Sequence, residues 1–261
     1  SLGRGLSGAA EATVIAQAVS GLGLGLYLWK KEPYYRFSPK RFLREEKPVG
    51  EICGYSLMTG MQQSVMNFGI LMVQSLVNSF GPAVMAAFAA TVKIDTFAYM
   101  PAQEFGNAYS IFISQNFGAE KTERVKQGTG KAMTVSAVFC GLISALVFAF
   151  ARFLMLIFVD AGETEIIEIG MQYLRIEGAF YIGIGILFLL YGYFRGVNRP
   201  GVSLVLTVIS LGTRVALAYI LAAVPGIGVL GIWWAIPIGW ALADVTGIVL
   251  MRRGRKCDEK I

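Results

Sequence analysis

Hydrophobic residues fall into seven long blocks along this chain, separated by short polar or charged stretches. A transmembrane helix needs about 20 apolar residues to cross the roughly 30 Å of hydrocarbon in a bilayer, and each block is long enough to do so. The alternating, roughly ten-residue strands typical of an outer-membrane barrel do not occur. The pattern predicts an all-α polytopic membrane protein, a helical bundle of about seven transmembrane helices at residues 8–29, 50–80, 82–117, 131–159, 165–194, 201–223 and 229–251.

Composition and charge support a membrane location. Only 15% of the 261 residues are charged, against about 25% in a soluble domain. Basic residues cluster in every second connection, near 30–47, 121–131, 195–199 and 252–256, and are absent from the intervening connections near 78–82, 160–168 and 222–228. This alternation follows the positive-inside rule. It predicts a multi-pass protein of the plasma (inner) membrane, with its linker and C terminus cytoplasmic. Binding of RNA or of anionic lipid head groups is the alternative explanation of the basic loops; we expect no nucleic-acid partner.

The first and last apolar blocks resemble each other. Both begin with a G-x-x-G segment, at 5–8 and 228–231, and both run on to a basic pair, although G-x-x-G is also common wherever membrane helices pack closely. We therefore expect parallel repeats, in a fragment that starts at Ser1 without a signal peptide. The predicted division is the last helix of a truncated first lobe (1–29), a basic cytoplasmic linker (30–49), a six-helix second lobe (50–251) and a cytoplasmic tail (252–261).

Three charges interrupt the block at 82–117. A charge at the bilayer centre costs about 2.5–3.5 kcal/mol even on lenient scales, so it usually faces a cavity or a partner. This favours a transporter over a simple anchor. Asp95 is the preferred cavity carboxylate, with Lys93 as an internal counter-charge; packing of Asp95 against a basic residue of a neighbouring helix is the alternative. Glu104 lies nine residues further and faces the other side of a straight helix, unless Pro101 kinks it.

A second carboxylate interrupts the block at 165–194. Glu177 and Tyr181 are four residues apart, so on one helix they share a face where a carboxylate and an aromatic ring could meet a cation. Glu177 could instead form an ion pair with Arg175 or Arg214, which would then be internal counter-charges.

Polar residues elsewhere in the blocks allow two interpretations. Gln62, Gln63 and Asn67 form a stripe that could bind substrate, although hydrogen bonding between helices is favoured. Arg195 and Arg199 close a short turn, and Asp244 lies towards the inner third of the last predicted helix; all three are expected to serve topology or cytoplasmic gating.

The chain lacks the usual residues of an enzyme site. It contains no histidine, and its three cysteines, Cys53, Cys140 and Cys257, are isolated, so no metal site, disulfide framework or cofactor is predicted. No nucleophile with a base is visible. A retinal protein is also disfavoured, because the last block has no lysine. We predict that the protein is not an enzyme.

Six motifs, in order and at matching spacing, resemble the multidrug and toxic compound extrusion (MATE) transporters. The similarity covers most of the chain and corresponds to the carboxyl-terminal lobe plus the last helix of the amino-terminal lobe. The motifs are QQSVMNFG at 62–69, IDT at 94–96, MPAQEFGNA at 100–108, QNFGA at 115–119, RGVNRP at 195–200 and GVLGIWWAIPIGWALAD at 228–244.

The resemblance implies a twelve-helix, two-lobe antiporter that exports amphipathic organic cations or drugs in exchange for H⁺ or Na⁺ by alternating access. The partners would be a drug substrate, membrane lipids and either the missing amino-terminal lobe or a second copy of the chain. Sodium-coupled members tend to carry a glutamate on the first helix of this lobe, where Gln62 and Gln63 stand here. A flippase of related architecture for lipid-linked saccharides, and a non-functional fragment, are the alternatives.

Overall fold

The protein is described by a computed structural model covering residues 5–31 and 49–258, which contain eight α-helices and no strand. This confirms the all-helical class. The helices are α1 (Gly5–Lys31), α3 (Val49–Asn78), α4 (Pro82–Gly118), α5 (Thr122–Leu156), α6 (Thr164–Gly178), α7 (Tyr181–Gly196), α8 (Pro200–Ala222) and α9 (Val229–Asp258).

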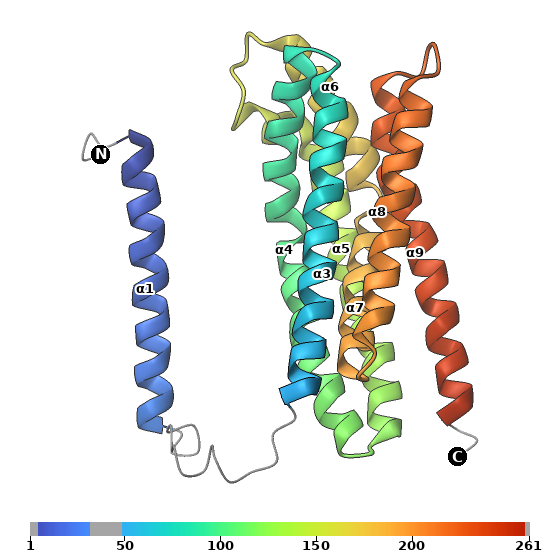
Figure 1. The fold of residues 1–261 in the computed structure, drawn as a ribbon. Coiled ribbons are helices and arrows are strands. Elements are labelled where there is room, and N and C mark those ends of the chain that lie inside the picture. The colour runs from blue at the N-terminus through green and yellow to red at the C-terminus, as the bar shows by residue number, and fades with distance from the viewer. Residues whose placement is uncertain (1–4, 32–48, 259–261) are drawn as a thin grey trace. The chain divides into compact units, whose positions relative to one another are not determined.

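The chain forms two units, the first of which contains α1. Most described side chains of α1 are exposed, including Val14, Leu22 and Trp29. The predicted linker lies largely outside the described residues. The second unit contains α3 to α9 (Figure 1). Its last helix continues to Asp258, so the part of the predicted tail that the structure describes is helical.

Within residues 5–31 and 49–258, five helices are long and apolar enough to cross a membrane, or six if the bent pair α6–α7 counts as one span. The prediction of about seven included residues 50–80, which do form the 30-residue helix α3. That helix is not among the five because polar residues such as Gln62, Gln63 and Asn67 lower its mean hydropathy. The count of spans by composition is therefore lower than predicted, while each predicted block does contain helix.

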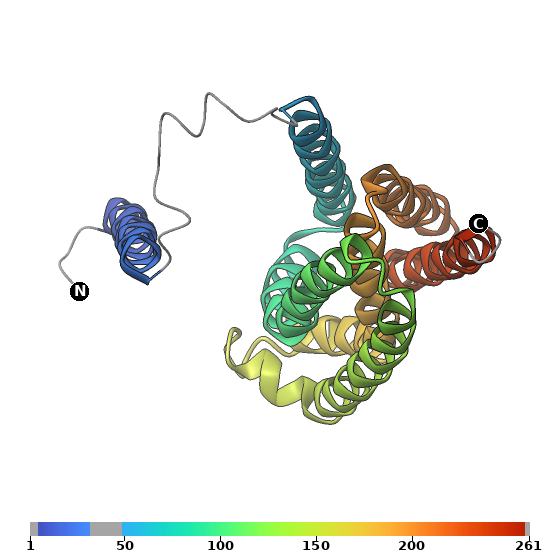
Figure 2. The same ribbon diagram turned by 90° about the horizontal axis from the view of Figure 1, so that it is seen from below.

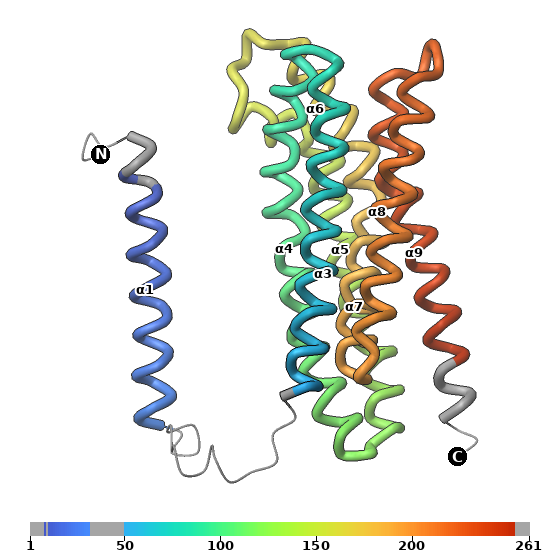
Figure 3. Tube along the Cα trace, viewed as in Figure 1, coloured from blue at the N-terminus to red at the C-terminus, as the bar shows by residue number. Residues whose placement is uncertain are grey.

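The block at 165–194 is not one continuous helix. The chain bends by 52° between α6 and α7, a break visible in the backbone trace of Figure 3. At the bend, the Phe180 N–H donates to the Glu177 carbonyl (3.0 Å) and the Gly183 N–H donates to the Phe180 carbonyl (2.8 Å). These i to i−3 bonds tighten the turn and satisfy groups that a helix end leaves free.

Helix α7 occupies the middle of the second unit. Every residue from Leu187 to Phe194 is buried, as expected for a helix that is apolar on all sides. It packs against α4, α5, α8 and α9, which surround it in the view along the bundle (Figure 2). Against α4 the backbones nearly touch: a Cβ on Gly192 would lie 2.5 Å from the Gly106 carbonyl oxygen.

The helices of the second unit alternate in direction if the bent pair α6–α7 counts as one span. The α4–α5 connection, the α7–α8 turn and the C-terminal end of α9 therefore all lie at the lower end in Figure 1, and each carries basic residues in the sequence. The connections that lack basic residues lie at the opposite end. The charge alternation seen along the sequence therefore becomes a basic end and a non-basic end of one bundle.

Candidate functional site: a buried acidic cluster

Asp95 of α4 and Glu177 of α6 lie together inside the bundle. Asp95 is 2% exposed and Glu177 is 3% exposed, and each carboxylate interacts with the other. The phenol of Tyr181 donates a hydrogen bond to Oδ1 of Asp95, and Tyr173 lies close to both carboxylates. We call these four residues and Arg214 the acidic cluster.

The α6–α7 bend assembles this cluster. Glu177 stands at the end of α6 and Tyr181 at the start of α7, so the two flank the break rather than sharing a face of one helix. Asp95 meets them from α4, thirteen residues after Pro82. With a rise of about 1.5 Å per residue, the cluster lies roughly 20 Å from the non-basic end of the bundle.

The charges of the cluster do not balance. Arg214 of α8 interacts electrostatically with both carboxylates. Oδ2 of Asp95, Oε2 of Glu177 and Nε of Arg214 are each buried without a hydrogen-bond partner. With all three groups ionised, two carboxylates and one guanidinium leave one negative charge in a site shielded from water, which is unfavourable. One proton or one monovalent cation would neutralise it.

Aromatic rings form one wall of the cluster. The ring of Tyr173 packs edge-on against Trp233 of α9 at 4.7 Å between centroids. Phe88 of α4 stacks on Trp233 at 5.7 Å. The faces of such rings attract cations. Two cavities in the described part of the chain, of about 920 and 530 Å³, lie between α4 and α5, and neither is lined by Asp95 or Glu177. Asp95 and Glu177 therefore lie in the packed interior of the bundle in this conformation, and they line neither cavity.

Two predicted counter-charges lie elsewhere. Lys93 is exposed, with its ammonium 5.9 Å from the centre of the Phe158 ring. Two residues on a helix are about 200° apart, so Lys93 and Asp95 point to nearly opposite sides. Arg175 lies over the ring of Phe148 at 5.6 Å. Of the three proposed counter-charges, only Arg214 is at the cluster.

Glu104 and Arg195 belong to a separate polar chain between α4 and α7. Glu104 is exposed and accepts a hydrogen bond from the Asn107 amide (3.3 Å), whose oxygen accepts one from the Arg195 guanidinium (3.1 Å). Arg195 also donates to the Tyr191 carbonyl (3.2 Å). These hydrogen bonds connect α4 and α7 near the basic end of the bundle. Arg199, by contrast, is exposed at the start of α8.

Asp244 is buried within α9. It is 8% exposed, lies midway along this helix, and its Oδ1 has no hydrogen-bond partner. Its Oδ2 would be 3.5 Å from a Cβ on Gly183 of α7. A part for Asp244 in gating or topology stays a prediction.

The predicted polar stripe on α3 divides into a buried and an exposed part. Gln62 is buried and donates to Oγ1 of Thr207 on α8 (3.0 Å). Thr207 in turn donates to the Ser203 carbonyl (2.9 Å). Gln63 and Asn67 are exposed. Gln62 therefore joins two helices within the bundle.

We expect Gln62→Ala to lower the free energy of unfolding by about 1 kcal/mol, the usual worth of a hydrogen bond between membrane helices. Thr207→Val should cost a similar amount, and the double variant little more than either alone. Unfolding by denaturant in mixed micelles measures this. Gln63→Ala, one residue away and exposed, is the matched control; an equal loss there would contradict the assignment.

Tyr173, Trp233 and Phe88 were not predicted from the sequence as site residues. Tyr173 could have been found, because it precedes Glu177 by four residues and so lies on the same face of α6. Trp233 and Phe88 gave no such signal, since aromatic residues are common in the core of an apolar bundle.

Comparison with known proteins identifies the family. The MatE family model matches residues 59–220. Two relatives from Bacillus subtilis are named "Probable multidrug resistance protein YpnP" (29% identical, over 79% of this chain and 45% of that protein) and "Probable multidrug resistance protein YoeA" (27%, over 92% and 52%). A solved structure, "Crystal structure of MATE in complex with MaL6", matches with a TM-score of 0.92 at 22% identity, over all of this chain and 59% of that one. The chain spans about half the length of the relatives it matches. It belongs to the MatE family of membrane transporters, as the motifs had indicated.

Proposed function

We propose that this chain is one lobe, with a preceding helix, of a secondary antiporter that exports amphipathic organic cations or drugs in exchange for H⁺ or Na⁺. The observation that carries the proposal is the acidic cluster, in which two buried carboxylates face one guanidinium beside an aromatic wall. The names of the Bacillus subtilis relatives, probable multidrug resistance proteins, support the same substrate class.

The cluster would couple the two fluxes by competition. One positive charge, from a coupling ion or from the substrate, would neutralise the single negative charge of the cluster. Binding of one occupant favours one conformation and displaces the other occupant, and a ligand shifts a conformational equilibrium only by its difference in affinity for the two states. Glu177 lies at the α6–α7 bend, and Asp95 of α4 lies beside it. A change in the bend angle would therefore open or close access to both carboxylates.

Alternating access requires a second lobe. The chain spans about half the length of its relatives, so the partner would be an amino-terminal lobe or a second copy of this chain. The basic end of the bundle would face the cytoplasm of a plasma-membrane protein, following the positive-inside rule.

The charge of the interior favours a cation exporter over a flippase for an anionic lipid-linked saccharide. Asp95, Glu177 and Asp244 are buried, whereas Arg214 is the one guanidinium of the cluster and Lys93 is exposed. A site for an anionic carrier should show the opposite balance.

Transport in vesicles tests the proposal. The chain, alone and together with an amino-terminal lobe, is reconstituted into vesicles loaded with a fluorescent organic cation, and an H⁺ or Na⁺ gradient is applied. We expect gradient-driven movement of the cation when both lobes are present, and none of a matched organic anion. Movement of the anion, or of neither compound, would overturn the assignment.

We expect Tyr181→Phe to slow this transport by about 10-fold, because hydrogen bonds to charged groups are worth roughly 1.5–3 kcal/mol. The substitution removes the donor to Asp95 and keeps the ring. Initial rates of cation efflux at saturating gradient measure the effect. Tyr219→Phe on α8, where the side chain is exposed, should transport at the unaltered rate; equal losses in both variants would contradict a role for the Asp95 bond.

A further inference from the structure

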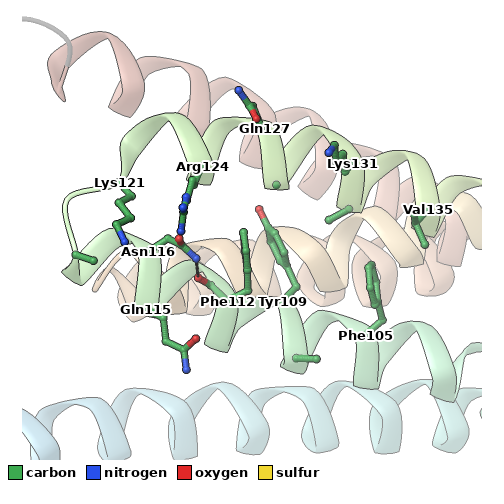
Figure 4. Close-up of a pocket in the computed structure, with 14 residues that line it drawn as sticks. Phe105, Tyr109, Phe112, Gln115, Asn116, Lys121, Arg124, Gln127, Lys131 and Val135 are labelled. Atoms are coloured by element: carbon green, nitrogen blue, oxygen red, sulfur yellow. Dashed lines mark hydrogen bonds between the residues drawn. The ribbon is translucent and has the colours of Figure 1, made fainter.

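A cavity of about 920 Å³ lies between the C-terminal half of α4 and the N-terminal half of α5, away from the acidic cluster. Figure 4 shows its two chemically different ends. Lys121 and Arg124 stand at one end, and Phe105 and Val135 at the other, with the ring of Phe112 between them.

The polar end is cationic. Lys121 and Arg124 are both exposed and line this end of the cavity. Lys131, also exposed, shares a face of α5 with Arg124 but lies about 10 Å further along the helix axis, beside Val135 (Figure 4). The amides of Gln115, Asn116 and Gln127 add hydrogen-bonding groups to the lining. This combination suits a phosphate diester, which takes charge-assisted bonds from guanidinium and ammonium groups.

The floor is aromatic and held in place. Gly128 leaves room for the Phe112 ring, which a Cβ at that position would overlap. The Asn116 amide donates to the Phe112 carbonyl (2.8 Å). The phenol of Tyr109 donates to Oγ1 of Thr129 on α5 (2.7 Å). An apolar floor of this kind gains nothing from a free inorganic anion but would bury an acyl chain.

The charged and apolar parts of the α4–α5 surface lie where the head group and the acyl chain of a lipid would lie. The cations lie at the basic end of the bundle, where α4 ends at Gly118 and α5 begins at Thr122. Further along the same two helices a second cavity, of about 530 Å³, is lined by apolar side chains alone, including Phe97 and Phe150. Going from Lys121 towards Phe150, the α4–α5 surface thus changes from charged to fully apolar, as a phospholipid does from head group to chain.

We propose that the α4–α5 cavity binds an anionic phospholipid, with its phosphate at Lys121 and Arg124 and an acyl chain over Phe112 and Phe105. The basic loop would then serve lipid binding as well as topology. The site does not depend on the exported substrate, because it shares no residue with the acidic cluster.

Binding of phosphatidylglycerol to the purified chain in detergent micelles, followed by native mass spectrometry, tests this. Phosphatidylcholine with the same acyl chains, and inorganic phosphate, are the comparison ligands. We expect phosphatidylglycerol to bind at least about 10-fold more tightly than phosphatidylcholine, a ratio worth roughly 1.4 kcal/mol, and phosphate not to compete at millimolar concentration. Equal binding of both lipids, or displacement by phosphate, would overturn the proposal.

Two matched pairs of variants locate the site. Lys121→Ala/Arg124→Ala should abolish the preference for phosphatidylglycerol. Lys126→Ala/Arg252→Ala removes the same charge from the same end of the bundle outside the cavity, and should keep the preference. Ala108→Trp, which fills the cavity, should weaken binding of the anionic lipid, whereas Ala89→Trp on the exposed side of α4 should not. Equal effects within either pair would contradict the site, and retained folding of each variant is checked by size-exclusion chromatography.

Discussion

Asp95→Asn is expected to lower ion-driven efflux of an organic cation by about 100-fold or more, equivalent to roughly 3 kcal/mol, the scale of breaking a buried charge pair. The substitution keeps the size of the side chain and removes the charge that a proton, an ion or a substrate would neutralise. Arg214 and Glu177 would then balance each other, leaving no negative charge for a cationic occupant. Initial rates of efflux in vesicles that contain both lobes measure the loss.

Glu104→Gln is the matched control, because Glu104 lies on the same helix and is exposed rather than clustered. We expect that variant to keep transport within about twofold of the unaltered protein, since single exposed charges contribute little. Full activity in Asp95→Asn, or an equal loss in Glu104→Gln, would show that Asp95 is not the coupling group.

Gly192→Leu is expected to prevent α4 and α7 from packing, with a loss of at least about 3 kcal/mol in the free energy of unfolding, the upper range of overpacking effects. A Cβ at Gly192 would lie 2.5 Å from the Gly106 carbonyl oxygen, and one at Gly106 would lie 2.8 Å from the Phe188 carbonyl oxygen. Both neighbours are backbone, so no side chain can rotate away. The folded fraction after extraction into detergent, by size-exclusion chromatography with fluorescence detection, measures this.

Gly130→Leu on α5 is the control for that prediction, because a Cβ there would meet nothing within 4 Å. It changes helix propensity and size in the same way without entering an interface. A variant at Gly192 that is as well folded as the one at Gly130 would mean that the two helices can separate without loss of the lobe.

The charged residues of the site were predictable, and their grouping was less so. Asp95 and Glu177 stand out in the sequence because a charge within an apolar block is costly wherever that block is buried in a membrane. That they meet depends on the α6–α7 bend. The sequence at 165–194 hides the bend, because no proline marks the break between the two helices.

Helix geometry could have corrected one prediction in advance. Lys93 and Asp95 are two residues apart, so on any straight helix they point to nearly opposite sides. The placement of Arg175 and Arg214 could not be decided in this way, because it depends on which helices are neighbours.

We propose that the acidic cluster holds either a coupling ion or an organic cation, but not both at once. Calorimetric titration of the purified two-lobe protein with a lipophilic organic cation, at several pH values and Na⁺ concentrations, tests it directly. We predict that the affinity falls about 10-fold for each 10-fold rise in H⁺ or Na⁺ over the competing range, the slope of one ion displaced per cation, and that Asp95→Asn abolishes this dependence. An affinity independent of both ions, or a dependence that survives in Asp95→Asn, would contradict the account.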